Sequence, residues 1–144
     1  MLKTLRAFVP LGALPALAAA SLSQTPTAQA NRMRVEITGL RSDKGKVLCA
    51  LFTSANDFPK NIDKAVAHAK AEIARGQAVC EFRDIAVGTY AVSIFHDENS
   101  NGKLDTNFMG IPREGVGASN NAVGHFGPPR FSAAAVQFSG ANSI

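Results

Sequence analysis

Oxygen-bearing side chains recur at every second position within residues 96–107, the stretch of the sequence with the clearest chemical spacing. With Asp97 counted as the first position, Asn99 and Asn101 stand third and fifth, and Gly102 stands sixth. An EF-hand loop begins in this way, because carboxylate, amide and carbonyl oxygens wrap a hard cation and the chain turns sharply at the glycine. The spacing therefore predicts a calcium-binding loop.

The second half of this pattern is incomplete. The carbonyl of Lys103 takes the seventh position and Asp105 the ninth, but the twelfth residue is Phe108 instead of a bidentate glutamate. With two anionic ligands we expect weak binding, with a Kd of about 10⁻⁴–10⁻³ M as in extracellular modules. An ion-free loop whose Asp and Asn side chains bond their own backbone is the alternative. The predicted ligands are Asp97, Asn99, Asn101, Lys103 and Asp105.

Residues 108–130 form a long segment rich in glycine and proline. Loops of this length inside a small domain are usually functional or disordered. Four apolar side chains are expected to pin this loop to the domain, namely Phe108, Ile111, Phe126 and Phe131. An ordered loop offers a polar surface for carbohydrate or for another protein, and the candidate residues are Glu114, Ser119, Asn120 and Asn121. Capping of a sheet end explains the same residues without a ligand.

Enzymatic interpretations have weaker support. Ser119 lacks the closing glycine and the strand–turn–helix context of a nucleophile elbow. His96 could hold a transition metal together with a folded-back His125, although a hydrogen-bonded histidine at a strand end is the simpler interpretation. A small periplasmic hydrolase that uses His96, Glu114 or Ser119 is therefore an alternative, and a non-enzymatic binding or structural role is preferred.

The first thirty residues have the three parts of a secretory signal peptide. Lys3 and Arg6 are basic, residues 8–22 are apolar, and Ala28 and Ala30 provide a small-residue cleavage site. Cleavage after Ala30 would export residues 31–144 to the periplasm or the exterior as a single domain.

The exported part is nearly neutral. Because the only two charged residues of the leader are basic, residues 31–144 carry thirteen basic and eleven acidic side chains, a net charge of +2. This charge gives no reason to expect nucleic acid or an anionic membrane as a partner. No further segment is apolar for long enough to span a bilayer. The expected partner is an envelope protein or a carbohydrate.

Cys49 and Cys80 are the only cysteines, and each lies in a predicted strand. An exported protein can form a disulfide between them, whereas two buried free thiols are the alternative. The sequence leaves both open, because it gives no Cα separation.

Apolar and polar residues alternate with a period of two through most of residues 31–144, which is typical of half-buried strands. The segment 46–53 is apolar on both faces and is expected to be central, whereas residues 67–74 also have helical propensity and are interpreted as a strand. We expect 33–40 and 46–53 to form a hairpin, and 67–74 to pair with 78–83. The predicted strands are 33–40, 46–53, 67–74, 78–83, 89–95 and 133–139. Six strands with short turns favour an all-β fold, a single antiparallel β-sandwich with one long glycine-rich loop.

Several runs resemble known families. Gly88-Thr89-Tyr90-Ala91-Val92 is similar to the entry of a core strand in transthyretin-like and other Ig-like sandwiches. The runs that carry a wider resemblance are TGLRSDKG (38–45), GTYAV (88–92), FHDENSNGKLDTNF (95–108), GIPREGVG (110–117), SNN (119–121) and FGPP (126–129). Together they resemble the exported bacterial family called domain of unknown function 2141. The resemblance implies a secreted or periplasmic β-sandwich and a strand at 67–74, and it implies no activity. The tail after Ser139 is shorter than the closing strand that the family leads us to expect.

Overall fold

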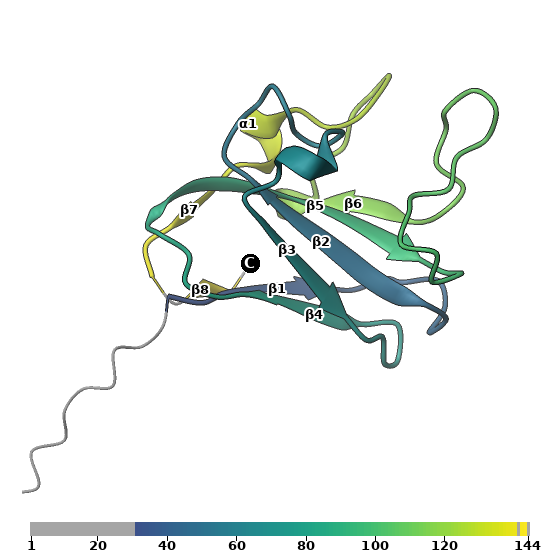
Figure 1. The fold of residues 1–144 in the computed structure, drawn as a ribbon, viewed down its shortest axis with the longest axis horizontal. Helices are drawn as coiled ribbons and strands as arrows, with labels where there is room; N and C mark the ends of the chain where they lie inside the picture. Colours follow the sequence, from purple (N-terminus) through teal and green to yellow (C-terminus); the bar gives the residue numbers. More distant parts are fainter. Residues whose placement is uncertain (1–30, 141, 144) are drawn as a thin grey trace, which may run out of the picture.

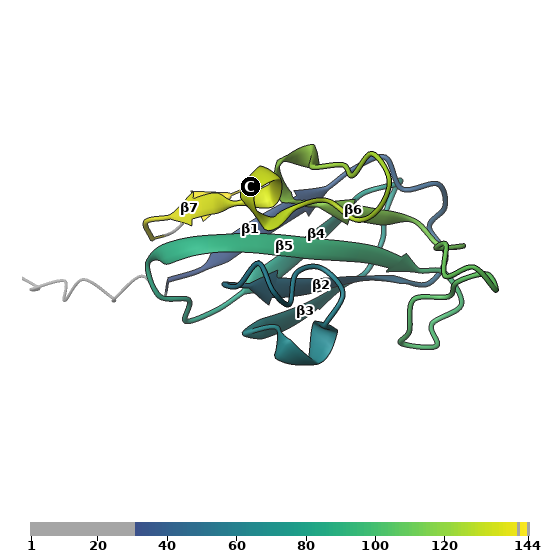
Figure 2. The ribbon, with the colours of Figure 1, turned by 90° about the horizontal axis from the view of Figure 1, so that it is seen from above.

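A computed structural model describes residues 31–140 and 142–143, so the predicted signal peptide lies outside the described residues. Two β-sheets pack face to face (Figures 1 and 2). The first sheet contains β4 (Ala78–Phe82), β1 (Met33–Ile37) and β8 (Asn142–Ser143), in that order. β1 runs antiparallel to β4 and parallel to β8.

The second sheet has the order β3 (Ala67–Ala71), β2 (Lys46–Phe52), β5 (Gly88–Asp97) and β6 (Val116–Ala118). β7 (Val136–Phe138) pairs with the first residues of β5, and β6 pairs with later residues of the same strand. Three short helical segments lie outside the sheets in the described part of the chain: η1 (Ile62–Lys64), η2 (Ser119–Asn121) and α1 (Phe131–Ala134). The predicted all-β sandwich is confirmed, and its Ig-like or transthyretin-like subclass stays a prediction.

The alternating pattern of β1 places its first, third and fifth residues in the core between the sheets, while the residues between them are exposed. β2 is buried on both faces, as its continuous apolar run predicts. Its second face lies under a smaller core in which Phe52, Phe58 and Phe131 make edge-to-face ring contacts with centroids 5.6 and 5.9 Å apart. The five-stranded sheet is therefore covered on both sides, and the long strand β5 leads through the core to the candidate site.

The expected hairpin between 33–40 and 46–53 is wrong, because β1 and β2 lie in different sheets. Residues between them cross from one sheet to the other and are anchored on the 75–76 turn. Asp43 accepts hydrogen bonds from the backbone N–H groups of Arg75 and Gly76, at 3.1 and 2.7 Å, and Leu40 donates to the carbonyl of Gly76. A strand at residues 67–71 is confirmed.

The expected pairing of that strand with 78–83 is also wrong. Ala74 and Gln77 form a single bridge across the turn, after which β3 pairs with β2 and β4 pairs with β1. β3 and β4 therefore lie on either side of the same tight turn but belong to opposite sheets.

The predicted last strand, 133–139, begins in a helical turn and is a strand only at its centre. Backbone N–H groups of Ala133 and Ala134 donate to the carbonyl of Arg130, so α1 occupies the first part and only Val136–Phe138 extends. The predicted loop 108–130 likewise contains β6, which is too short for an alternating pattern to reveal.

Candidate functional site

The predicted metal loop begins where β5 ends, and its first residue is held in the body of the protein. His96 and Asp97 are each 3 % exposed. The Nε2–H of His96 donates to the carbonyl of Lys44 at 2.6 Å, so this histidine is hydrogen-bonded at a strand end. The pairing of β5 with β2 thus fixes the backbone position of Asp97, the first residue of the loop.

The Asp97 carboxylate organises the first turn of the loop. Its Oδ1 accepts the N–H of Asn101 at 3.0 Å, and its Oδ2 accepts the N–H of Gly102 at 2.8 Å. Gly102, the sixth residue of the pattern, has a φ of +75°. These bonds wrap the chain around the carboxylate.

Three further predicted ligands converge on one another. The Nδ2 of Asn99 donates to Asp105 Oδ2 at 2.6 Å, and the Nδ2 of Asn101 donates to the two oxygens of Asp105 at 3.0 and 3.2 Å. Asn101 Oδ1 also accepts the N–H of Lys103 at 2.8 Å. The loop therefore makes the internal bonds of the Asx alternative. It also brings together the side chains that the calcium interpretation requires, with the amide nitrogens of Asn99 and Asn101 turned toward Asp105, so that both amides would have to rotate to offer their oxygens to an ion.

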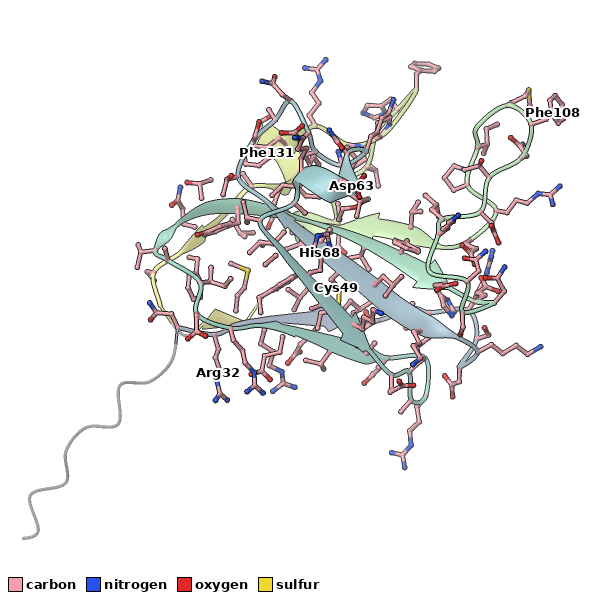
Figure 3. The ribbon with its side chains drawn as sticks, viewed as in Figure 1. Arg32, Cys49, Asp63, His68, Phe108 and Phe131 are labelled. Atoms are coloured by element: carbon pink, nitrogen blue, oxygen red, sulfur yellow. A yellow bond between two sulfur atoms is a disulfide. The ribbon has the colours of Figure 1, made fainter. Side chains whose placement is uncertain are left out.

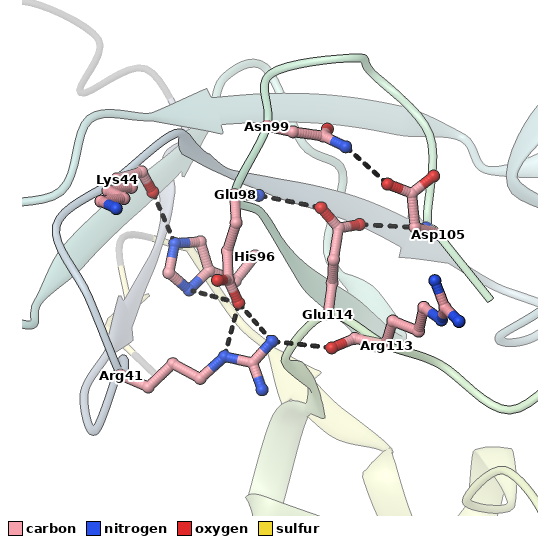
Figure 4. A network of polar contacts seen from close by, with 8 residues as sticks. All are labelled: Arg41, Lys44, His96, Glu98, Asn99, Asp105, Arg113 and Glu114. Carbon is pink, nitrogen blue, oxygen red and sulfur yellow. Dashed lines mark hydrogen bonds and ion pairs between the residues drawn. The ribbon is translucent and has the colours of Figure 1, made fainter. Parts of the chain in front are cut away.

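Glu114 closes this loop from outside. The residue is 8 % exposed, and its Oε1 and Oε2 accept the N–H groups of Glu98 and Asp105, both at 3.0 Å (Figure 4). Its carboxylate therefore links the second and ninth residues of the loop. Glu114, a candidate residue of the predicted ligand surface, holds the two ends of the loop together in the structure.

Arg41 joins the loop to the connection between β1 and β2. Its guanidinium pairs with the carboxylate of Glu98 and donates to the carbonyl of Arg113 at 2.7 Å (Figure 4). The sequence alone does not reveal this role, because nothing in an isolated arginine before a turn indicates a partner more than fifty residues away.

The donor set of the loop consists mainly of oxygen atoms. Among the residues that the structure describes, no group of three or more His, Cys, Asp and Glu side chains is gathered closely enough to hold a metal ion. A cation here would consequently depend on amide and carbonyl oxygens as well as on Asp97 and Asp105, which calcium accepts and softer metals disfavour.

Phe108, at the twelfth position, is 97 % exposed and extends away from the domain (Figure 3).

The polar run after β6 has structural contacts. Ser119 is 6 % exposed, and its Oγ accepts the N–H of Val92 at 2.9 Å and donates to the carbonyl of Ala134 at 2.5 Å. Asn120 donates to the carbonyl of Ala135 at 2.8 Å, whereas Asn121 is exposed. This geometry favours capping of the sheet and of α1 over a continuous ligand surface of Glu114, Ser119, Asn120 and Asn121.

The expected pinning of the 108–130 segment is wrong for three of its four residues. Phe131 packs on Phe58, but Phe108, Ile111 and Phe126 are exposed. In residues 105–113 the chain is held by backbone hydrogen bonds and by the side chain of Asn107.

Comparison with family models matches residues 35–144 to the family described as "Uncharacterized protein conserved in bacteria (DUF2141)". No curated protein and no solved structure matches the chain. No helix in residues 31–140 is both long and apolar enough to cross a membrane.

Proposed function

The chain belongs to DUF2141, a family of uncharacterised bacterial proteins, and we propose from its structure that it is an exported β-sandwich module whose 97–105 loop binds calcium. The observation that carries this proposal is the buried Asp97 carboxylate at the first position of the loop. It is fixed by β5 and by the N–H groups of Asn101 and Gly102, while Asn99, Asn101 and Asp105 meet beside it.

Calcium fits this donor set because its coordination shell takes carboxylate, amide and carbonyl oxygens in flexible numbers. Asp97, Asn99, Asn101, Asp105 and the carbonyl of Lys103 would hold the ion. Glu114 would act as a positioning residue, since its bonds to the N–H groups of Glu98 and Asp105 already bring the loop ends together. Few anionic ligands are present, so we expect a Kd of about 10⁻⁴–10⁻³ M.

The role of the ion would be structural. Residues 106–113 follow the loop directly, and the N–H of Arg113 donates to the carbonyl of Asp105 at 2.8 Å. An ion held by Asp105 would therefore fix the base of this segment relative to β5.

Export is supported by two independent observations. The signal-peptide pattern of residues 1–30 is one. The Cys49–Cys80 disulfide is the other, because disulfides form and persist in oxidising compartments.

Thermal unfolding of residues 31–144, which contain all the strands that the structure describes, tests the calcium proposal. At a calcium concentration tenfold above the Kd, binding stabilises the fold by roughly 1.4 kcal/mol. We expect the Tm to rise by about 5 °C relative to chelator for a domain of this size. Calorimetric titration with calcium measures the Kd directly.

Two variants make this test specific. Asp105→Asn removes an anionic ligand and should abolish the calcium-dependent rise in Tm. Asp63→Asn makes the same charge change on the exposed η1 and should retain it. An unchanged Tm in the unsubstituted protein, or a full calcium shift in Asp105→Asn, would show that the loop is an ion-free turn.

A further inference from the structure

Two loops end in exposed apolar side chains. Tip 1 (residues 107–111) exposes Phe108, Met109 and Ile111, and tip 2 (residues 122–128) exposes Val123 and Phe126. Both loops project from the same side of the molecule, away from the three-stranded sheet (Figure 1). An exposed apolar patch larger than a single side chain, such as the three side chains exposed within the five residues of tip 1, marks a candidate contact surface.

Tip 1 is held by polar bonds that do not involve these side chains. Oδ1 of Asn107 accepts the N–H groups of Met109 and Ile111 at 2.9 and 3.0 Å, and the backbone of Asn107 bonds with Gly110 and Ile111. The apolar groups are thus displayed by a structure that does not need them for its own packing.

Tip 2 is a tight turn. A Cβ on Gly124 would overlap the carbonyl oxygen of Gly127, so the chain doubles back closely there. Phe126 lies within this turn and is fully exposed. Its ring is available for an external contact.

The charge within the two tip segments is one-sided, with Asp105 and Glu114 standing directly before and after the first of them. Residues 106–113 and 122–130 contain no Asp or Glu, whereas they contain Arg113, His125 and Arg130. The neighbouring segment 55–64 is balanced, with two lysines and two aspartates. Although the whole domain is nearly neutral, the two tip segments themselves carry positive charge that would favour an anionic partner.

We propose that tips 1 and 2 attach this domain to the surface of an anionic phospholipid bilayer. Apolar groups at the tips would enter the boundary between headgroups and acyl chains, and the adjacent arginines would face anionic headgroups. Separate convex tips suit a fluid surface, which closes around each of them. A protein partner would need a matching hollow for each tip, because protein hot spots lie in well-packed pockets.

Vesicle sedimentation in chelator tests this proposal independently of calcium binding. The probes are vesicles of phosphatidylcholine alone and of phosphatidylcholine mixed with phosphatidylglycerol, with residues 31–144 as the protein. We expect binding to the mixed vesicles and a loss on the order of tenfold or more for each aromatic ring removed. The test variant is Phe108→Ser/Phe126→Ser, whose substituted side chains are exposed and make no core contact.

A matched control removes exposed apolar side chains that lie outside the two tips. Val79→Ser/Val87→Ser replaces two exposed valines outside the tips, on β4 and before β5, and should bind vesicles like the unsubstituted protein. Arg113→Gln/Arg130→Gln should weaken binding to the mixed vesicles by about fivefold per arginine and leave any residual binding to phosphatidylcholine unchanged.

Absence of binding to the mixed vesicles, or equal losses in the phenylalanine and valine variants, would overturn the proposal. Circular dichroism and Tm values equal to those of the unsubstituted protein show that each variant is folded.

Discussion

The hydroxyl group of Ser119 is engaged in two buried hydrogen bonds. It accepts from the N–H of Val92 in β5 and donates to the carbonyl of Ala134 in α1. A nucleophilic serine needs an adjacent base and access for its substrate, and burial at 6 % exposure denies that access. The side chain therefore joins the sheet to the helical turn that covers it.

Ser119→Ala should lower the free energy of unfolding by about 1–3 kcal/mol, because a buried N–H and a buried carbonyl each lose a partner. Urea denaturation measures the change. Ser132→Ala, on the exposed side of the same helical turn, is the control and should change stability by less than about 0.5 kcal/mol. Equal stability of the two variants would contradict the structural role of Ser119.

At the scale of secondary-structure elements, the connection between β1 and β2 positions the candidate site. Gly45 has a φ of +71° and lies against the backbone of Asp97 and Glu98, where the 97–105 loop begins. Arg41, in the same connection, holds Glu98 and the carbonyl of Arg113. The connection between β1 and β2, which crosses from one sheet to the other, thus supports the loop at the end of β5.

Gly45→Ala should destabilise the protein strongly and should weaken any calcium response, since the new Cβ would overlap the carbonyl oxygen of Asp97. Gly39→Ala is a matched control in the same connection, because Gly39 has a φ of +72° and a Cβ added there would meet nothing within 4 Å. The control should lose about 1–2 kcal/mol from the positive φ alone. Gly45→Ala should lose about 1–3 kcal/mol more from the overlap, measured by urea denaturation. Equal losses of stability in the two variants would mean that the backbone of Asp97 and Glu98 moves to accommodate the new Cβ without destabilising the protein.

At the scale of the whole molecule, the two sheets are joined by a covalent bond. Cys49 on β2 and Cys80 on β4 form a disulfide across the core. The bond encloses residues of both sheets and spans 31 positions of the sequence. It therefore restricts the unfolded chain as well as linking the layers of the folded one.

Removing this bond in Cys49→Ala/Cys80→Ala should reduce the free energy of unfolding by about 3–4 kcal/mol, as loop-closure entropy predicts for this separation. Denaturation with and without reductant provides the check. Reductant should destabilise the unsubstituted protein and leave the double variant unchanged. A reductant effect of the same size in both proteins would show that it does not act through this disulfide.

The sequence by itself determined the longer strand-forming segments and the spacing of the loop. Period-two alternation predicts which residues of β1 are buried, and the apolar run of β2 predicts a central strand. Both predictions succeed because the order of apolar and polar residues along a strand shows whether one face or both faces are buried. The spacing from Asp97 to Asp105 likewise predicts a wrapped loop, since it depends on neighbouring residues. The motifs that resemble DUF2141 correctly indicated the family.

Only the tertiary structure decided which strands pair and which distant residues complete the site. Alternation states which face of a strand is buried but not which edge meets a neighbour, so β1 and β2 separate into different sheets and β3 and β4 diverge after one bridge. Glu114 reaches Glu98 and Asp105 because the chain folds back after tip 1, and Arg41 reaches Glu98 from the connection between β1 and β2. These contacts join residues far apart in sequence, and their energy exists only once the two sheets have packed.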